Sequence, residues 1–97
     1  TVVAPTPVTL DFSVYIKVDD DYSLAQGRTM IQSNLEAYYE EAIEDGEIKW
    51  ADCFAIITDT DGVYDAKDFL LNGGTVNVSV AATMYPKTGT LTVTAYT

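Results

Sequence analysis

The sequence contains no histidine, one cysteine and only five basic residues among its 97 positions. Without histidine, the most common general base and most catalytic triads are excluded. A single cysteine forms no disulfide within the chain, and no CxxC motif or Cys/His cluster offers a zinc site. Fifteen acidic residues give a net charge of −10. This charge argues against nucleic-acid binding, because phosphate contacts require a basic surface.

No stretch of the sequence is suited to crossing a membrane. The longest uncharged run, residues 69–86, contains Asn72, Gly73 and Gly74, whereas a spanning helix needs about 20 mainly apolar residues. Residues 1–7 have no methionine and no basic segment before an apolar one, so they are not a signal peptide. We interpret residues 1–7 as an extended segment and expect residues 8–97 to form one domain cut from a longer protein.

The charge that is present is unevenly distributed. All fifteen acidic residues lie between Asp11 and Asp68, where four basic residues leave a net charge of −11. Beyond Asp68 the only charged residue is Lys87. The chain therefore has an acidic first part and a nearly neutral last part that is rich in threonine and valine.

The first two elements are a strand and a long helix. Residues 10–18 alternate apolar and polar side chains, which predicts a strand with one buried and one exposed face. Ser23 and Gln26 match a capping box, and Gly46 suits a helix end. Gly27 would allow close packing of this helix on the sheet. The apolar stripe of the helix comprises Leu24, Ile31, Leu35, Tyr38 and Ala42.

The second half of the chain predicts a shorter helix and three strands. The helix is expected near residues 51–58 and the first strand over residues 63–71. Asn72-Gly73-Gly74 predicts a hairpin turn with a returning strand over residues 76–80. A loop is expected around residues 85–87. The alternation of apolar and polar side chains then resumes over residues 90–96, which predicts the last strand. This order predicts an α+β two-layer sandwich, with a mostly antiparallel sheet and both helices on one face.

No group of residues predicts catalysis or metal binding. Asp59-Thr60-Asp61-Gly62 is typical of calcium loops, but Ile57 stands at the first EF-hand position and Asp68 at the last, so a plain turn is the simpler interpretation. Cys53 lies in an apolar run without a histidine to activate it, which indicates an inert buried thiol. Thr1 shows no sign of autoprocessing. The glutamates of the long helix lie on a surface where solvation is expected. We therefore expect no enzyme, cofactor or metal site.

Aromatic residues leave carbohydrate binding open as an alternative function. The sequence has seven tyrosines and one tryptophan, and aromatic rings can stack on sugar faces. Tyr15, Tyr85 and Tyr96 are the candidates for exposure, whereas Trp50 is expected to fill the junction between helix and sheet. A calcium-stabilised adhesin domain is a third and more remote interpretation.

Four segments of the chain form a recognisable series. They are Val2-Val3-Ala4-Pro5 with the strand after it; Ile31, Leu35 and Tyr38-Tyr39 leading to Gly46 and Ile48; residues 50–57 with residues 60–65; and Leu70-Leu71-Asn72, Asn77-Val78, Tyr85-Pro86 and residues 89–93. Taken in order, these segments resemble the C-terminal region of the baseplate J-like family of contractile phage tails and related prophage particles. The resemblance covers nearly all of the chain but only part of a full family protein. Ala51 stands where the family usually has a capping Ser or Asp, and Asp61 where Pro is frequent.

The resemblance implies a structural and non-catalytic role. Such proteins are wedge components that surround a central hub, so the expected partners are other baseplate subunits in contacts between like and unlike chains. The expected location is the tail baseplate or a tail-like particle assembled in the bacterial cytoplasm. We expect neither nucleic acid, nor a membrane span, nor a small-molecule ligand. The strand predicted over residues 90–96 should lie at a sheet edge and contact another subunit through Thr90, Thr92, Thr94 and Tyr96.

Overall fold

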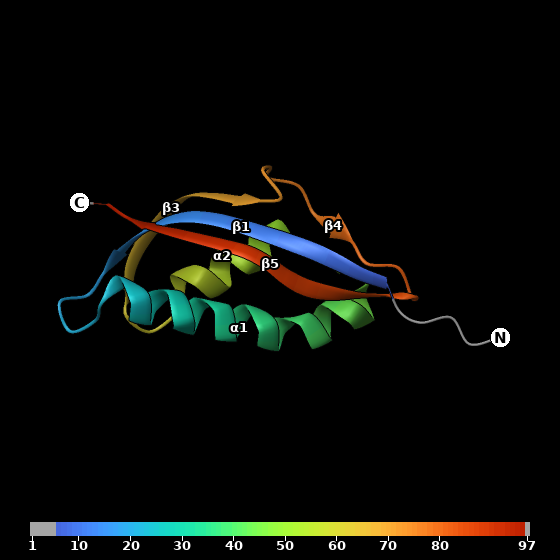
Figure 1. The fold of residues 1–97 in the computed structure, drawn as a ribbon, viewed down its shortest axis with the longest axis horizontal. Coiled ribbons are helices and arrows are strands. Elements are labelled where there is room, and N and C mark those ends of the chain that lie inside the picture. Colours follow the sequence, from blue (N-terminus) through green and yellow to red (C-terminus); the bar gives the residue numbers. More distant parts are fainter. Residues whose placement is uncertain (1–5, 97) are drawn as a thin grey trace.

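The computed structural model describes residues 6–96 of the chain, which form an elongated molecule of 53 × 21 × 19 Å (Figure 1). Of the expected extended segment 1–7, residues 1–5 lie outside the described part, and Thr6 and Pro7 belong to the first strand. The elements in chain order are β1 (Thr6–Val18), α1 (Leu24–Asp45), β2 (Glu47–Ile48), α2 (Trp50–Thr58), β3 (Val63–Leu71), β4 (Val78–Ser79) and β5 (Met84–Ala95).

The main sheet has three strands in the order β3-β1-β5, with the first strand at its centre. β3 pairs with β1 antiparallel, whereas β5 pairs with β1 parallel, from Thr6↔Met84 to Ile16↔Ala95. The prediction of a mostly antiparallel sheet is therefore wrong for the last strand. Alternating side chains identify a strand but carry no information about the direction of its partner.

Both helices cover the same face of this sheet, which confirms the predicted α+β fold (Figure 1). α1 packs against β5 and α2 against β3. Four inward residues in the middle of β1 are at most 1 % exposed, so the central strand forms the middle of the core. These inward residues are Leu10, Phe12, Val14 and Ile16.

The local signals of α1 are confirmed. The Gln26 N–H donates to the Ser23 hydroxyl over 3.1 Å, and the Ser23 N–H donates to the Gln26 side chain over 2.8 Å. Gly46 ends the helix with φ of 80°, and its N–H donates to the Ala42 carbonyl. A Cβ at Gly27 would lie 3.3 Å from the side chain of Ile16, so this glycine does permit close packing on the sheet.

α2 begins one residue earlier than predicted and has no cap from its own N-terminal neighbour. The Trp50 N–H instead donates over 2.9 Å to the side-chain oxygen of Asn77, which lies just before β4. The Trp50 indole N–H donates to the Phe69 carbonyl, and its ring lies 5.4 Å from that of Phe54. Trp50 thus fills the junction between helix and sheet, as predicted.

The region after β3 differs from the predicted hairpin in one respect. The tight turn forms: Asn72 and Gly73 have φ of 52° and 77°, and the Leu71 N–H donates to the Gly74 carbonyl over 2.8 Å. The returning strand, however, is only Val78–Ser79, and it pairs with β2 instead of β3. The expected loop around Pro86 is part of β5, where an edge strand tolerates the missing N–H.

Candidate subunit-contact edge

β5 forms one edge of the main sheet. Its inner side pairs with β1, where the Tyr96 N–H donates to the Ile16 carbonyl over 3.0 Å. Because backbone groups alternate in direction along a strand, those of Leu91, Val93 and Ala95 point to the outer side. No strand within residues 6–96 pairs with that side. The last strand therefore lies at a sheet edge, as predicted.

Arg28 of α1 reaches this edge. Its Nε donates over 3.1 Å to the outward carbonyl of Leu91, in a partly buried contact. The carbonyl is thereby satisfied without a strand partner. Sequence reasoning missed this contact because the two residues are 63 positions apart and no local pattern links them. Basic side chains commonly protect exposed strand edges in this way.

The predicted contact residues divide into two groups. Thr90, Thr92 and Thr94 are exposed and alternate with the inward residues Leu91 and Val93, so they form one row on the face of the sheet opposite the helices. This row is uncharged and offers hydroxyl groups beside the free backbone edge. The geometry suits it to strand pairing and to no evident chemical reaction.

Tyr96 is instead held by β3. Its ring lies 4.5 Å from the Lys67 ammonium, so the side chain reaches across β1 on the open face. Partial desolvation, followed by the neighbouring Asp65 carboxylate, raises the pKa of the Tyr96 phenol above its ordinary value. We conclude that Tyr96 anchors the end of β5 to the sheet, whereas Thr90, Thr92 and Thr94 remain exposed.

A bulge of β5 at Gly89 and Thr90, opposite Asp11, sets the register of the threonine row. The pairing of β1 with β5 shifts between Leu10 and Phe12, and the Asp11 carboxylate accepts the Thr90 N–H over 2.8 Å. Gly89 is required at this point, because a Cβ there would collide with the Asp11 carboxylate and lie 2.6 Å from the Thr9 side chain. No local pattern indicates this contact, which spans 79 positions.

The opposite edge of the sheet is less regular. β3 shifts its register against β1 twice, between Ser13 and Tyr15 and between Lys17 and Val18. Asp68 lies at the first irregularity with φ of 52°. Bulges and charged side chains hinder the addition of another strand, so the β3 edge is less suited to pairing than the uncharged part of β5 from Leu91 to Ala95, which follows the bulge of that strand. The charged residues of β3 are Asp65, Lys67 and Asp68.

The candidate sugar-binding tyrosines do not form one platform. Tyr15 pairs with Thr94 near the end of β5, close to Tyr96, whereas Tyr85 pairs with Pro7 near the opposite end. Lys67 already lies over the Tyr96 ring. The sheet face therefore offers two neighbouring rings, one of them occupied by an ammonium group.

The buried titratable groups are part of the core. Cys53 is 0 % exposed, and burial raises the pKa of its thiol to about 12. Burial raises the pKa of Tyr38 and that of Tyr39 to about 12. The Tyr38 hydroxyl bonds to Asp52 over 3.2 Å and the Tyr39 hydroxyl to Thr88 over 2.7 Å. All three groups are neutral at pH 7.

The remaining acidic residues do not gather into a metal site within residues 6–96. This includes Asp59 and Asp61, which follow α2 in a turn. Thr1, the other candidate considered from the sequence, lies outside the described residues.

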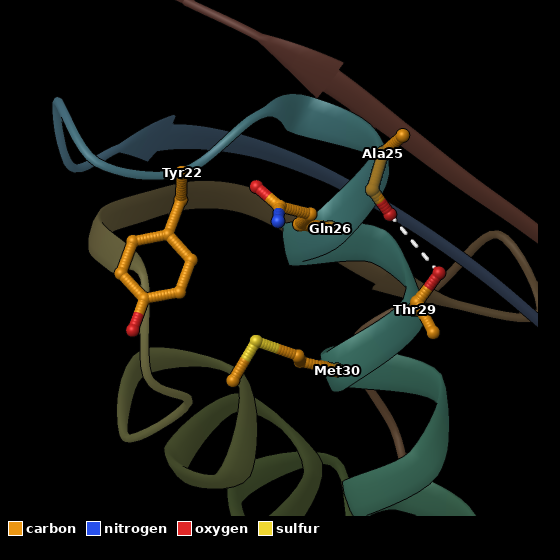
Figure 2. A pocket seen from close by; sticks show the side chains of 5 residues that line it. All are labelled: Tyr22, Ala25, Gln26, Thr29 and Met30. Atoms are coloured by element: carbon orange, nitrogen blue, oxygen red, sulfur yellow. Dashed lines mark hydrogen bonds between the residues drawn. The ribbon is translucent and has the colours of Figure 1, made fainter.

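Figure 2 shows a shallow hollow of about 400 Å³ beside the start of α1, lined by Tyr22, Ala25, Gln26, Thr29 and Met30. The Gln26 amide belongs to the helix cap, and the Thr29 hydroxyl donates to the Ala25 carbonyl over 3.0 Å. The hollow is mainly apolar and open to solvent. Of its polar side chains, Gln26 and Thr29 are engaged in these hydrogen bonds, and Tyr22 adds a phenol.

Comparisons with known proteins identify the family. Neither helix in the described part of the chain has the length and apolar character needed to cross a membrane. A search of curated proteins gives no match. The family model described as "Baseplate J-like protein C-terminal domain" matches residues 10–94, which include the main sheet apart from the first four residues of β1 and the last residue of β5. The chain therefore belongs to the family of baseplate J-like protein C-terminal domains.

Proposed function

We propose that this chain is a non-catalytic assembly module of a contractile-tail baseplate, which packs against other subunits through the free edge of β5. Family membership points to a structural, non-enzymatic role in a phage baseplate. The observation that carries the finer proposal is the regular, uncharged edge from Leu91 to Ala95 on a sheet whose other edge is bulged.

The edge supplies both parts of a strand contact. Outward backbone groups can form main-chain hydrogen bonds with an added strand, and the neighbouring side chains set which strand fits. On the exposed face these side chains are Thr90, Thr92 and Thr94, which bring no charge that must lose its hydration on burial. Tyr96 contributes by holding the end of the strand in place.

The proposed setting follows from the same role. The chain acts as a wedge-type component, with residues 8–97 as one domain of a longer protein. Its partners are other baseplate subunits, including further copies of itself. The particle is a virion tail or a tail-like particle assembled in the bacterial cytoplasm. The net charge of −10 supports protein partners over nucleic acid.

Thr92→Lys tests this proposal in assembled particles. The new ammonium group would lie in the contact, where its desolvation opposes strand pairing. We expect particle yield, counted by electron microscopy, to fall at least tenfold. The purified variant should unfold at the same urea concentration as the unchanged chain, because Thr92 is exposed.

Leu70→Lys is the matched control for Thr92→Lys. Leu70 is 37 % exposed and pairs with Ser13 on the opposite edge of the same sheet face. Particles should form normally with this variant. Normal particles from Thr92→Lys, or equal losses from both variants, would contradict the placement of the contact at β5.

Carbohydrate binding is the alternative function. Only Tyr15 and Tyr96 of the three candidate tyrosines lie close together, and two rings form a smaller stacking surface for a sugar than three. A glycan array that gives hits with the unchanged chain, and loses them with Tyr15→Ala or Tyr96→Ala, would support it. Tyr85→Ala serves as the control, since Tyr85 lies near the other end of β5.

A further inference from the structure

We propose that the β5 edge binds β5 of a second copy of this chain, antiparallel and about a two-fold axis at Val93, so that two three-stranded sheets join into one of six strands. This inference rests on the proposed function and names the partner at that site.

The backbone of β5 is arranged for such a pairing. Leu91, Val93 and Ala95 direct their N–H and C=O groups outward, and Val93 is the middle one of the three. In an antiparallel pair centred there, Val93 faces its own counterpart and Leu91 faces Ala95 of the second copy. All three outward residues then exchange hydrogen bonds as directly opposed pairs.

The distribution of charge favours contact between two copies at the β5 edge over contact at the acidic parts of the surface. β1, β3 and β5 contain three lysines and three aspartates, so the net charge of −10 lies outside the main sheet. Residues 88–96 carry no charge. α1 carries Arg28 beside Leu91, and its first carboxylate, Glu36, accepts the Thr88 hydroxyl three residues before Leu91. Two copies can therefore meet here without bringing acidic side chains together.

The side chains at the edge are also self-complementary. A two-fold axis at Val93 places Thr92 opposite Thr94 of the other copy, twice, on the exposed face of the sheet. Threonine pairs across antiparallel strands are favourable, by about 0.2–1 kcal/mol relative to alanine pairs. Because residues 88–96 are uncharged, the pairing brings no like charges together across the two strands.

Arg28 explains how the edge remains stable before pairing. Its Nε satisfies the Leu91 carbonyl in the single copy. A carbonyl oxygen has two lone pairs, so the same atom can also accept the Ala95 N–H of a second copy while Arg28 stays in place. Strand addition therefore costs no hydrogen bond that the single copy already has.

Disulfide trapping tests the pairing and its register. Opposed residues of the Thr92–Thr94 kind have Cα atoms about 4.5 Å apart, within the range that a disulfide spans. Thr92→Cys and Thr94→Cys are made separately, and the 97-residue chains are mixed under mild oxidation. We expect cross-linked dimer to form at least tenfold faster in the mixture than with either variant alone. Cys53 does not interfere, because it is fully buried.

Leu70→Cys on the β3 edge gives the background rate of collision. The inference is overturned if this control cross-links as fast as the mixture, or if either threonine variant cross-links faster alone than mixed. It is also overturned if no sample cross-links. Failure here together with lost assembly of Thr92→Lys particles would mean that β5 pairs with a different subunit, and the proposed function would stand.

Discussion

Single residues fix the position of the β5 edge through contacts that span most of the chain. Gly89 leaves room for the Asp11 carboxylate, which accepts the Thr90 N–H. Arg28 satisfies the outward carbonyl of Leu91. Each contact joins a side chain to a backbone group more than 60 positions away. The edge thus depends on residues outside β5 itself.

Gly89→Ala should destabilise the domain. Its Cβ would collide with the Asp11 carboxylate and the Thr9 side chain, and relieving such crowding typically costs about 1–3 kcal/mol. Urea unfolding measures the loss of free energy. Gly74→Ala is the control, because a Cβ there meets its nearest atom at 3.9 Å. Equal stability of the two variants would contradict the tight fit at Gly89.

Local signals predicted some of these residues and missed others. The capping box of Ser23 and Gln26, the buried Cys53 and the junction role of Trp50 follow from short-range patterns, and all three are confirmed. Arg28 and Asp11 gave no such pattern, because their partners become neighbours only after the chain has folded. The candidate contact surface could therefore be located on the strand but not explained from the sequence.

At the scale of elements, the helices were predicted well and the strand pairing was not. Helix periodicity and caps are properties of one segment, so α1 and α2 appear within a residue or two of their predicted bounds. The alternation in residues 76–80 and 90–96 predicted strands, yet β4 has two residues and β5 begins at Met84. Pairing depends on which segments meet in space, and alternation alone contains no such information.

Asn77 provides the clearest test at this scale, because it caps α2 from a distant segment. Asn77→Ala removes the acceptor of the Trp50 N–H and should cost about 1 kcal/mol, as lost helix caps do. Asn77→Asp keeps an acceptor oxygen and should retain most of the stability. Thermal unfolding compares these variants with Thr75→Ala, an exposed neighbour. A melting temperature of Asn77→Ala equal to that of Thr75→Ala would rule out the capping role.

For the whole molecule, the charge asymmetry of the sequence becomes a division between layers. The three long strands have no net charge, whereas the rest of the chain carries all of the −10. Like charge keeps the helical layer hydrated and discourages contact between identical helical faces. The neutral sheet is the layer that can be covered by another subunit.

The stability of the whole domain should fall at high pH. Burial raises the pKa of Cys53 from 9.0, and those of Tyr38 and Tyr39 from 10.0, to about 12. The folded state then keeps protons that the unfolded chain releases, so this stability is complete below pH 9 and is lost as the pH rises toward 12. Urea unfolding between pH 7 and pH 11 measures the decline.

Cys53→Ala separates the contribution of the thiol. Between pH 9 and pH 11 the decline should become shallower by about 1 kcal/mol per pH unit, whatever the variant costs at pH 7. Tyr64→Phe is the control, since this side chain is 70 % exposed. An unchanged slope in Cys53→Ala would show that the thiol ionises equally well in the folded state.

The parallel pairing of the first strand with the last has a consequence for how the protein folds during synthesis. Thr6 pairs with Met84 and Ile16 with Ala95, so the central strand lacks one neighbour until the residues of β5 have left the ribosome. Contacts of such high sequence separation also form slowly, because closing a long loop costs conformational entropy before the contacts can stabilise the fold. The same strand that completes the sheet is the one that presents the free edge. With the contact placed at β5 as proposed, a newly made domain would acquire its assembly surface only when this last strand joins the sheet.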